Sequence, residues 1–307
     1  MQPDEKENNI SAGTRRQFIG RSLLLAGSWG LGSSLTGSGL AAFSRGTYTV
    51  QQVIDLILRS VPGAPFPDTV DTLKAGRPGQ PVTGIVTTMF PTIEVIRKSH
   101  ARGANFIIAH EPSFYNHTDD VNWVPGNKVV ESKRALLEET QTCIWRFHDY
   151  WHSVKPAGIT YGVVKSAGWL PYFSGDKALL EIPALSLADL ATHLKRSLQI
   201  EKVRVIGSPD HSCSRLALMP GAWGGQRQIE IVEQQQPDVL IVGEVNEWET
   251  AEYIRDRRAL GMPAALIILG HVQSEEPGME WLVSWLSAQI KDLPISHIPS
   301  GDPFTWM

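Results

Sequence analysis

The sequence predicts an α/β protein with parallel strands. Two segments, residues 82–109 and residues 239–270, follow the same order: an apolar strand, an amphipathic helix, a helix-ending glycine and a second apolar strand. A helix that joins two strands in this way forms a βαβ unit with parallel strands. The 307 residues, of which 42% are hydrophobic and 20% charged, are enough for a large core, either as one complex domain or as two lobes.

The first βαβ unit begins with a strand predicted over residues 82–88. Pro91 presets the first turn of the helix that follows, and Ile93 and Ile96 supply its buried stripe. Gly103 ends this helix, since glycine adopts the left-handed conformation found just beyond helix ends.

The second unit begins with a strand at residues 239–242 and continues with a helix from Trp248 to Leu260. Gly261 ends the helix, and the closing strand runs from Leu266 to Gly270. In both units the chain turns polar directly after the closing strand.

Between the two units we predict a helix over residues 186–198 and strands over residues 203–206 and 216–219. A glycine-rich turn follows at residues 219–225. It either presents backbone N–H groups to an anion or is a tight strand-to-helix connection. The turn lacks the lysine and the hydroxyl residue of a P-loop, so it does not by itself predict nucleotide binding.

Histidine and acid residues follow the closing strand of each unit. His110 and Glu111 follow the first, and His271 and Glu275 follow the second. The carboxyl ends of parallel strands lie at one edge of a sheet, and histidine with carboxylate suits first-row transition metals. Taken singly, His110 is better explained as a cap of the sheet and Glu275 as an acid at a helix start. His271 and Glu275 share a helix face if the helix near Ser274 begins one turn earlier.

A third polar cluster contains His148, Asp149 and His152 and follows another short strand. The alternative for this segment is an exposed aromatic loop. Three such clusters after strands together predict a shared metal centre. His117 is a further candidate ligand or, alternatively, an exposed loop histidine.

These motifs resemble the Nif-three-like family, also labelled GTP cyclohydrolase type-two homologues, over nearly all of the chain after residue 48. Family members read Gly-Ala-Asp-Leu-Ile-Ile-(Ser/Ala)-His-His-Pro where this chain has residues 103–112. Next come a His-x-x-x-Asp segment, a glycine-rich turn, a strand ending in Thr-Gly-Glu or Thr-Gly-Asp, and a closing Gly-His-x-x-Ser-Glu. Here these correspond to residues 148–152, 221–225, 242–244 and 270–275.

Two departures from the family pattern fall on ligand positions. The family's second histidine is Glu111 here, and its aspartate is His152. The resemblance then implies two divalent ions (zinc, manganese or iron), with Glu275 bridging them. The implied ligands, which keep the family's three histidines and two carboxylates, are His110, Glu111, His152, His271 and Glu275. His148 and Asp149 are held in reserve, either as ligands or as residues that orient a ligand ring.

The resemblance also implies a fold of two interlocked α/β lobes with mixed sheets built from βαβ units. Residues 45–307 then form the metal-binding domain, with a central lobe at about 180–235. It further implies a homo-oligomer, commonly a hexamer, with its sites facing an internal cavity.

The function we expect is metal-dependent hydrolysis of a small molecule, either a cyclic amide or amidine or a phosphoester. Glu244 is the candidate for an additional catalytic acid, with a solvated loop carboxylate as the alternative. The competing class is a non-catalytic metal-binding or interaction protein. Five protein ligands for two ions leave coordination positions open, which favours catalysis.

The amino terminus predicts export. Residues 14–19 match a twin-arginine signal, and no charge lies between Arg21 and Arg45. We expect residues 1–44 to be a signal peptide, cleaved near Ala41 or Ala42, and the exported protein to be periplasmic. A membrane anchor is the alternative, but glycine and serine make this segment a poor span. The net charge of −4 gives no basic footprint for nucleic acid, and two cysteines give no disulfide framework.

Overall fold

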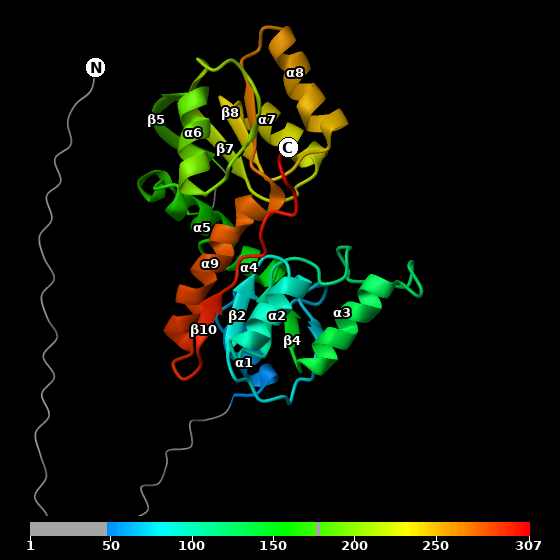
Figure 1. Cartoon of the computed structure of the whole chain (residues 1–307). Helices are drawn as coiled ribbons and strands as arrows, with labels where there is room; N and C mark the ends of the chain where they lie inside the picture. Colours follow the sequence, from blue (N-terminus) through cyan, green and yellow to red (C-terminus); the bar gives the residue numbers. More distant parts are fainter. Residues whose placement is uncertain (1–47, 176–178) are drawn as a thin grey trace, which may run out of the picture. The chain divides into compact units, whose positions relative to one another are not determined.

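Two five-stranded mixed sheets organise the chain (Figure 1). The computed structural model describes residues 48–175 and 179–307. The first sheet contains, in spatial order, β1 (Leu73–Ala75), β4 (Cys143–Arg146), β3 (Phe106–Ala109), β2 (Ile85–Thr88) and β10 (Ile295–His297). The second contains β5 (Leu179–Ser186), β7 (Ser212–Met219), β8 (Val239–Val242), β9 (Ala265–Ile268) and β6 (Arg204–Ile206). The predicted α/β fold with two mixed-sheet lobes is confirmed.

Helices connect most of these strands. The helices of the first half of the chain are α1 (Val50–Leu58), α2 (Ile93–Ala101), α3 (Lys128–Glu139), α4 (Asp149–Ser153) and α5 (Gly158–Ser166). A 3₁₀ turn at Leu170–Tyr172 precedes the second sheet. Its helices are α6 (Leu187–Ser197), α7 (Gly225–Gln235), a π-helical turn (Glu247–Ala251) that leads into α8 (Glu252–Ala259), and α9 (His271–Gln289).

Both predicted βαβ units are present. β2 and β3 run parallel with α2 between them, and β8 and β9 run parallel with α8 between them. Thr92 caps the start of α2 by accepting a hydrogen bond from the N–H of Val95 at 3.1 Å. Gly103 and Gly261 follow the two helices with φ values of +71° and +80°, which L-residues adopt rarely. The residues directly after β3 and β9 therefore lie at carboxyl ends of parallel strands.

The C-terminal part of the chain joins the two lobes. After β9, α9 begins at His271, and β10 then pairs in parallel with β2 of the first sheet (Figure 1). The chain thus builds most of the first sheet, then the second, and returns to complete the first. Residues 180–235, which the sequence marks off as a central lobe, share the second sheet with β8 and β9.

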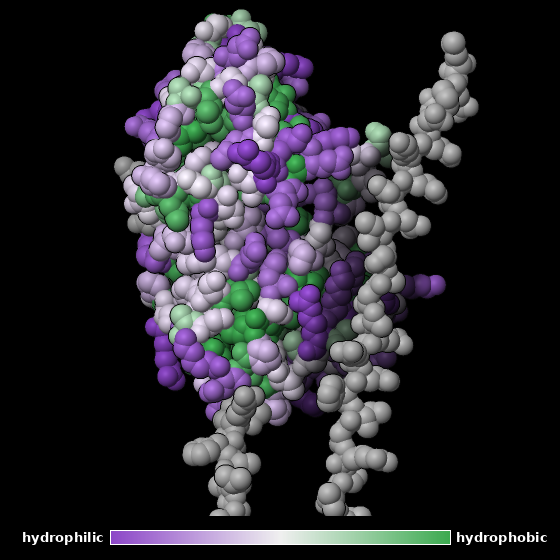
Figure 2. All heavy atoms as spheres, turned by 60° about the vertical axis from the view of Figure 1, so that its left-hand side comes forward, coloured by the Kyte–Doolittle hydropathy of each residue, from purple (hydrophilic) through white to green (hydrophobic). Residues whose placement is uncertain are grey.

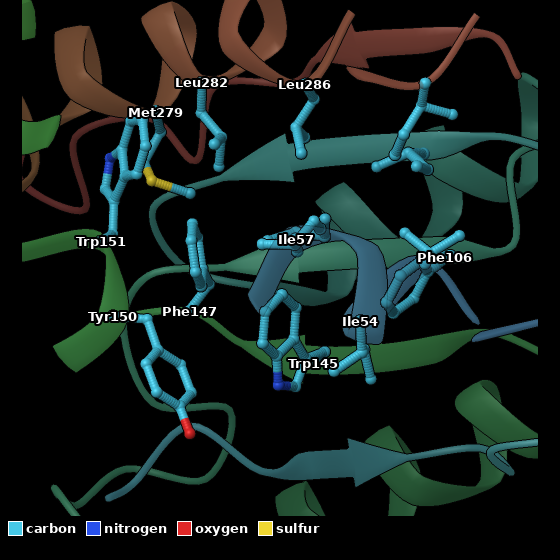
Figure 3. Packing of buried hydrophobic residues seen from close by; sticks show 14 of the residues in the cluster. Ile54, Ile57, Phe106, Trp145, Phe147, Tyr150, Trp151, Met279, Leu282 and Leu286 are labelled. Carbon is cyan, nitrogen blue, oxygen red and sulfur yellow. The ribbon is translucent and has the colours of Figure 1, made fainter. Parts of the chain in front are cut away.

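The main core of the first lobe lies between α1, the sheet and α9 (Figure 3). Ile54 and Ile57 of α1 project toward Phe106 and Trp145 of the sheet. Met279, Leu282 and Leu286 line the face of α9 that covers the same core, and each has an exposed fraction of 0%. Burial of this apolar surface fixes the start of α9 relative to the strand ends of the first sheet.

Helices α5 and α9 cross at two glycines. A Cβ atom placed on Gly162 would lie 2.4 Å from the Cα of Gly278, and one placed on Gly278 would lie 2.6 Å from the Cα of Ile159. Only residues without a side chain allow the two backbones to approach this closely. This contact holds the N-terminal half of α9 beside α5.

The surface mixes hydrophilic residues with separate hydrophobic patches on the face drawn in Figure 2. Cys143 and Cys213 are buried and unpaired, and they lie in separate core clusters. None of the helices in the described residues has the length and hydropathy needed to cross a bilayer. The predicted signal peptide lies outside the described residues.

Candidate metal centre

His110 stands directly after β3 with its imidazole fully buried. Its Nδ1 lies 3.3 Å from the backbone oxygen of Phe147. A carbonyl oxygen only accepts hydrogen bonds, so Nδ1 carries the proton and Nε2 keeps a free lone pair. Among the described residues Nε2 has no hydrogen-bond partner, and it lies 3.8 Å from Oε2 of Glu275.

Glu111 lies at the same strand end and is held by Arg146 of β4. One carboxylate oxygen lies 3.4 Å from a guanidinium nitrogen of Arg146, and the other lies 3.3 Å from Nε2 of His271. Arg146 is 1% exposed and also donates to the backbone oxygens of His110 and His117. The buried guanidinium of Arg146 therefore fixes both the His110–Glu111 segment and the loop that follows it.

His148 and His152 are brought in by α4. They lie one helical turn apart, with ring centres 4.8 Å from each other and 4.6 Å and 5.0 Å from the ring of His110. Asp71, which is 6% exposed, starts this helix by accepting hydrogen bonds from the backbone N–H groups of His148 and Tyr150, each at 2.8 Å. Burial raises the pKa of Asp71 to about 6.

Asp149 faces away from the donor cluster. Its carboxylate accepts hydrogen bonds from Nδ1 of His148 at 2.8 Å, from the hydroxyl of Thr69 at 2.7 Å and from the N–H of Val70 at 3.2 Å. The bond to Nδ1 leaves Nε2 of His148 directed at Glu111, 3.9 Å away. Asp149 therefore orients the ring of His148. It lies outside the two groups of potential metal ligands described below, whereas His148 belongs to one of them.

His271 and Glu275 are supplied by the first turn and a half of α9. Because α9 begins at His271, the two side chains share a helix face, with Nε2 and Oε2 3.1 Å apart. Nδ1 of His271 lies 3.3 Å from a carboxylate oxygen of Glu244, whose side chain is 54% exposed. Glu244 thus lies on the other side of His271, in a neighbouring pocket, and orients its ring.

The glycine-rich turn after β7 packs against these α9 residues. Gly221 has φ +79°, and a Cβ atom there would lie 2.3 Å from Oε1 of Glu275. Its N–H donates to the hydroxyl of Ser274 at 2.9 Å. This position therefore requires glycine both for its backbone conformation and for its contact with the buried Glu275 carboxylate.

Two groups of potential ligand atoms result, and they share His110. In each group the ligand atoms lie within 4.8 Å of one another: the first is His110, His148 and His152, and the second is His110, Glu111 and Glu275. A cavity of about 540 Å³ opens onto them and is also lined by His117 and His271. The two groups contain five of the seven predicted metal ligands. His271 lies beside them, in contact with Glu111 and Glu275, and Asp149 lies behind His148.

The protonation states of His110 and His152 favour a bound cation. Burial, reinforced by the neighbouring histidines, lowers the pKa of His110 and brings that of His152 to about 4, so both imidazoles are neutral at pH 7 and keep a lone pair. Burial opposes the charge on His271, but hydrogen bonds to Glu111, Glu244 and Glu275 outweigh it and raise its pKa to about 12. In the metal-free protein His271 therefore supplies the positive charge that the clustered carboxylates require.

The donor set fits a divalent metal ion. A buried imidazole nitrogen without a partner leaves a lone pair unsatisfied, which is costly unless another group fills the space beside it. Imidazole and carboxylate together suit zinc, manganese and iron. One imidazole nitrogen binds one ion, so the Nε2 of His110 would serve only one of the two groups at a time.

Sequence reasoning missed the supporting residues. Asp71 lies in a proline-rich connection, and Arg146 is the last residue of a short strand, so neither has a spacing that links it to the histidines. For Arg146 the sequence held one indication of a structural role, because an arginine within an apolar strand is a buried charge that needs a partner. His117, left open as a ligand or a loop residue, lines the cavity with its ring 5.8 Å from that of His148.

Comparisons with known proteins agree with this fold. The chain is 22% identical over 209 residues to a GTP cyclohydrolase 1 type 2 homolog of Clostridium perfringens, covering 64% of this chain and 74% of the relative. A Bacillus cereus protein related to NIF3 superposes with a TM-score of 0.68 at 14% identity, covering 85% of this chain and 99% of that one. A Staphylococcus aureus protein superposes with a TM-score of 0.67 at 17% identity, with the same coverage. Residues 50–303 match the family described as Duf34/NIF3 (NGG1p interacting factor 3), and the chain belongs to this family.

Proposed function

We propose that this protein is a metal-dependent hydrolase acting on a small molecule, a cyclic amide or amidine or a phosphoester, with two divalent ions (zinc, manganese or iron) in the candidate centre. The observation that carries the proposal is the unpartnered, buried Nε2 of His110, which stands where the two donor groups meet. The 540 Å³ cavity beside the groups is of the size that proteins use for small ligands.

Bound divalent ions would supply an activated water and would stabilise the negative charge that develops on the attacked centre. The protein's own residues prepare the site for this. His110 and His152 are neutral donors, and Glu111 and Glu275 balance cationic charge. Glu244, half exposed and in contact with His271, is the proposed additional acid or base.

The cellular setting is also part of the proposal. We place the protein in the periplasm after twin-arginine export, as a homo-oligomer without a stable membrane anchor. The basis for export is the arginine pair at positions 15 and 16 and the glycine-rich segment that follows it. The homo-oligomer is proposed from the family resemblance. The net charge of −4 supports a small-molecule substrate over a nucleic acid.

The test is a substrate panel of phosphoesters, nucleotides and cyclic amides, run with metal-loaded protein. We expect metal-dependent turnover of at least one class, with a loss of at least 100-fold in His271→Ala. His100→Ala is the matched control, because His100 is an exposed histidine of α2 outside the cavity lining. Stoichiometric metal without metal-dependent turnover on any class would favour a non-catalytic metal-binding protein instead.

A further inference from the structure

The lining of the cavity also carries an aromatic and a cationic side chain. Trp223 and Arg227 both line the cavity. Trp223 belongs to the glycine-rich turn, and Arg227 lies in the first turn of α7. We name this pair the Trp223–Arg227 shelf.

The indole ring of Trp223 is held in place by a hydrogen bond and is partly exposed. Its Nε1–H donates to the backbone oxygen of Pro220 at 2.7 Å, and the residue is 39% exposed. Gly221, two residues earlier, packs directly against Glu275. The same turn therefore places the indole ring close to Glu275. An exposed, oriented indole is a stacking surface for a planar ligand.

Arg227 lies beside this ring. Its guanidinium carbon is 6.0 Å from the indole centre, and no carboxylate of the described residues forms an ion pair with it. The two acidic residues of the cavity lining, Glu111 and Glu275, belong to the donor groups, whereas the other charged residues of the lining are the basic Lys155 and Arg227. An exposed guanidinium in this position suits a carboxylate or a phosphate.

The backbone amides at the start of α7 are a weaker anion site. A Cβ atom on Gly225 would lie 2.2 Å from a carboxylate oxygen of Glu249, so an acidic group already packs against the first residue of the helix. This carboxylate would repel a second anion at the helix start. The anion of a ligand therefore belongs on Arg227.

We propose that the cavity binds a small planar ring compound with an anionic substituent, whose ring lies against Trp223 and whose anion lies on Arg227. The proposal rests on the proposed function in so far as this compound is the substrate that the donor groups act on. The shared chemistry is a ring with a carboxylate or a phosphate, and the experiment distinguishes the two.

The experiment is isothermal titration calorimetry on the metal-loaded protein with two matched pairs of probes. AMP and adenosine test a phosphate, and nicotinate and nicotinamide test a carboxylate. We expect the anionic member of at least one pair to bind about tenfold more tightly, which is about 1.4 kcal/mol. Arg227→Ala should abolish this preference, Arg227→Lys should keep part of it, and Trp223→Ala should weaken both members of the pair.

The matched controls are Arg255→Ala and Trp248→Ala, two exposed residues outside the cavity lining, and both should leave binding unchanged. Equal binding within both pairs, or a preference that survives Arg227→Ala, would overturn the proposal. The second outcome would mean that the anion binds the metal ions directly. Because turnover is not the readout, a protein without hydrolase activity can still pass this test.

Discussion

Replacing Arg146 by methionine should destabilise the fold and the candidate centre together. Methionine keeps most of the apolar length of the side chain but removes the guanidinium. That group is 1% exposed and forms ion pairs with Glu111 at 3.4 Å and with Asp119 at 3.8 Å. It also donates to two backbone oxygens of the loop after β3.

The expected cost follows from what remains after the substitution. Breaking a buried ion pair by removing one partner costs about 3–5 kcal/mol, because the other charge stays buried. Two carboxylates lose a partner here, but Asp119 keeps Lys74 at 3.1 Å and Glu111 keeps His271 at 3.3 Å. We therefore expect the free energy of unfolding to fall by about 3 kcal/mol, the lower end of that range.

The assay is urea unfolding of the metal-free protein, followed by circular dichroism. Arg196→Met is the matched control, since Arg196 is exposed on α6, and its free energy of unfolding should change by less than about 0.5 kcal/mol. A loss below about 1 kcal/mol in Arg146→Met would show that the guanidinium does not hold the donor segment in the way argued here.

Three further predictions concern the helix crossing, the charge of the site and the orientation of its ligands. Gly162→Ala should lower the free energy of unfolding, measured by urea titration, by about 2 kcal/mol, because its Cβ would meet the α9 backbone at 2.4 Å. Gly79→Ala, with open space around the new Cβ, is the control and should be nearly neutral. At pH 7 metal binding should displace about one proton from His271, whose pKa is raised to about 12, so that metal affinity rises with pH. Calorimetry in two buffers of different ionisation enthalpy measures the released proton. Equal heats of binding in the two buffers would contradict the positive charge assigned to His271. Asp149→Asn should weaken metal affinity about tenfold by loosening the ring of His148, and unchanged affinity in a chelator competition would argue against this role.

The parts of the fold that sequence predicted are those set by local patterns. The helix-ending glycines and the apolar strands defined both βαβ units, and with them the positions of His110 and His271 just beyond their closing strands, which lie in different sheets. The return of residues 295–297 to pair beside β2 was not predictable, because nothing in a three-residue strand encodes a partner about 200 positions earlier in the chain.

The orientation of individual side chains was equally out of reach. Spacing could not decide whether His148 or Asp149 faces the cluster, because the choice depends on Thr69 and Asp71 in a connection without periodicity. Likewise, the presence of Glu111 in place of a family histidine predicted a negative charge at that position. It did not predict that the buried Arg146 would pair with that carboxylate. Such long-range polar contacts follow from the fold and leave no trace in local sequence.

The most direct test of the central claim is the metal content of the purified protein. After zinc, manganese or iron is supplied and excess metal is removed, mass spectrometry of the elements should find about two ions per chain, the number that we propose for this centre. His110→Ala should bind fewer ions than the wild type, because this residue contributes its free Nε2 to the centre, whereas His100→Ala should match the wild type. Fewer than one ion per chain in the wild-type protein would contradict the metal centre and the hydrolase proposed from it.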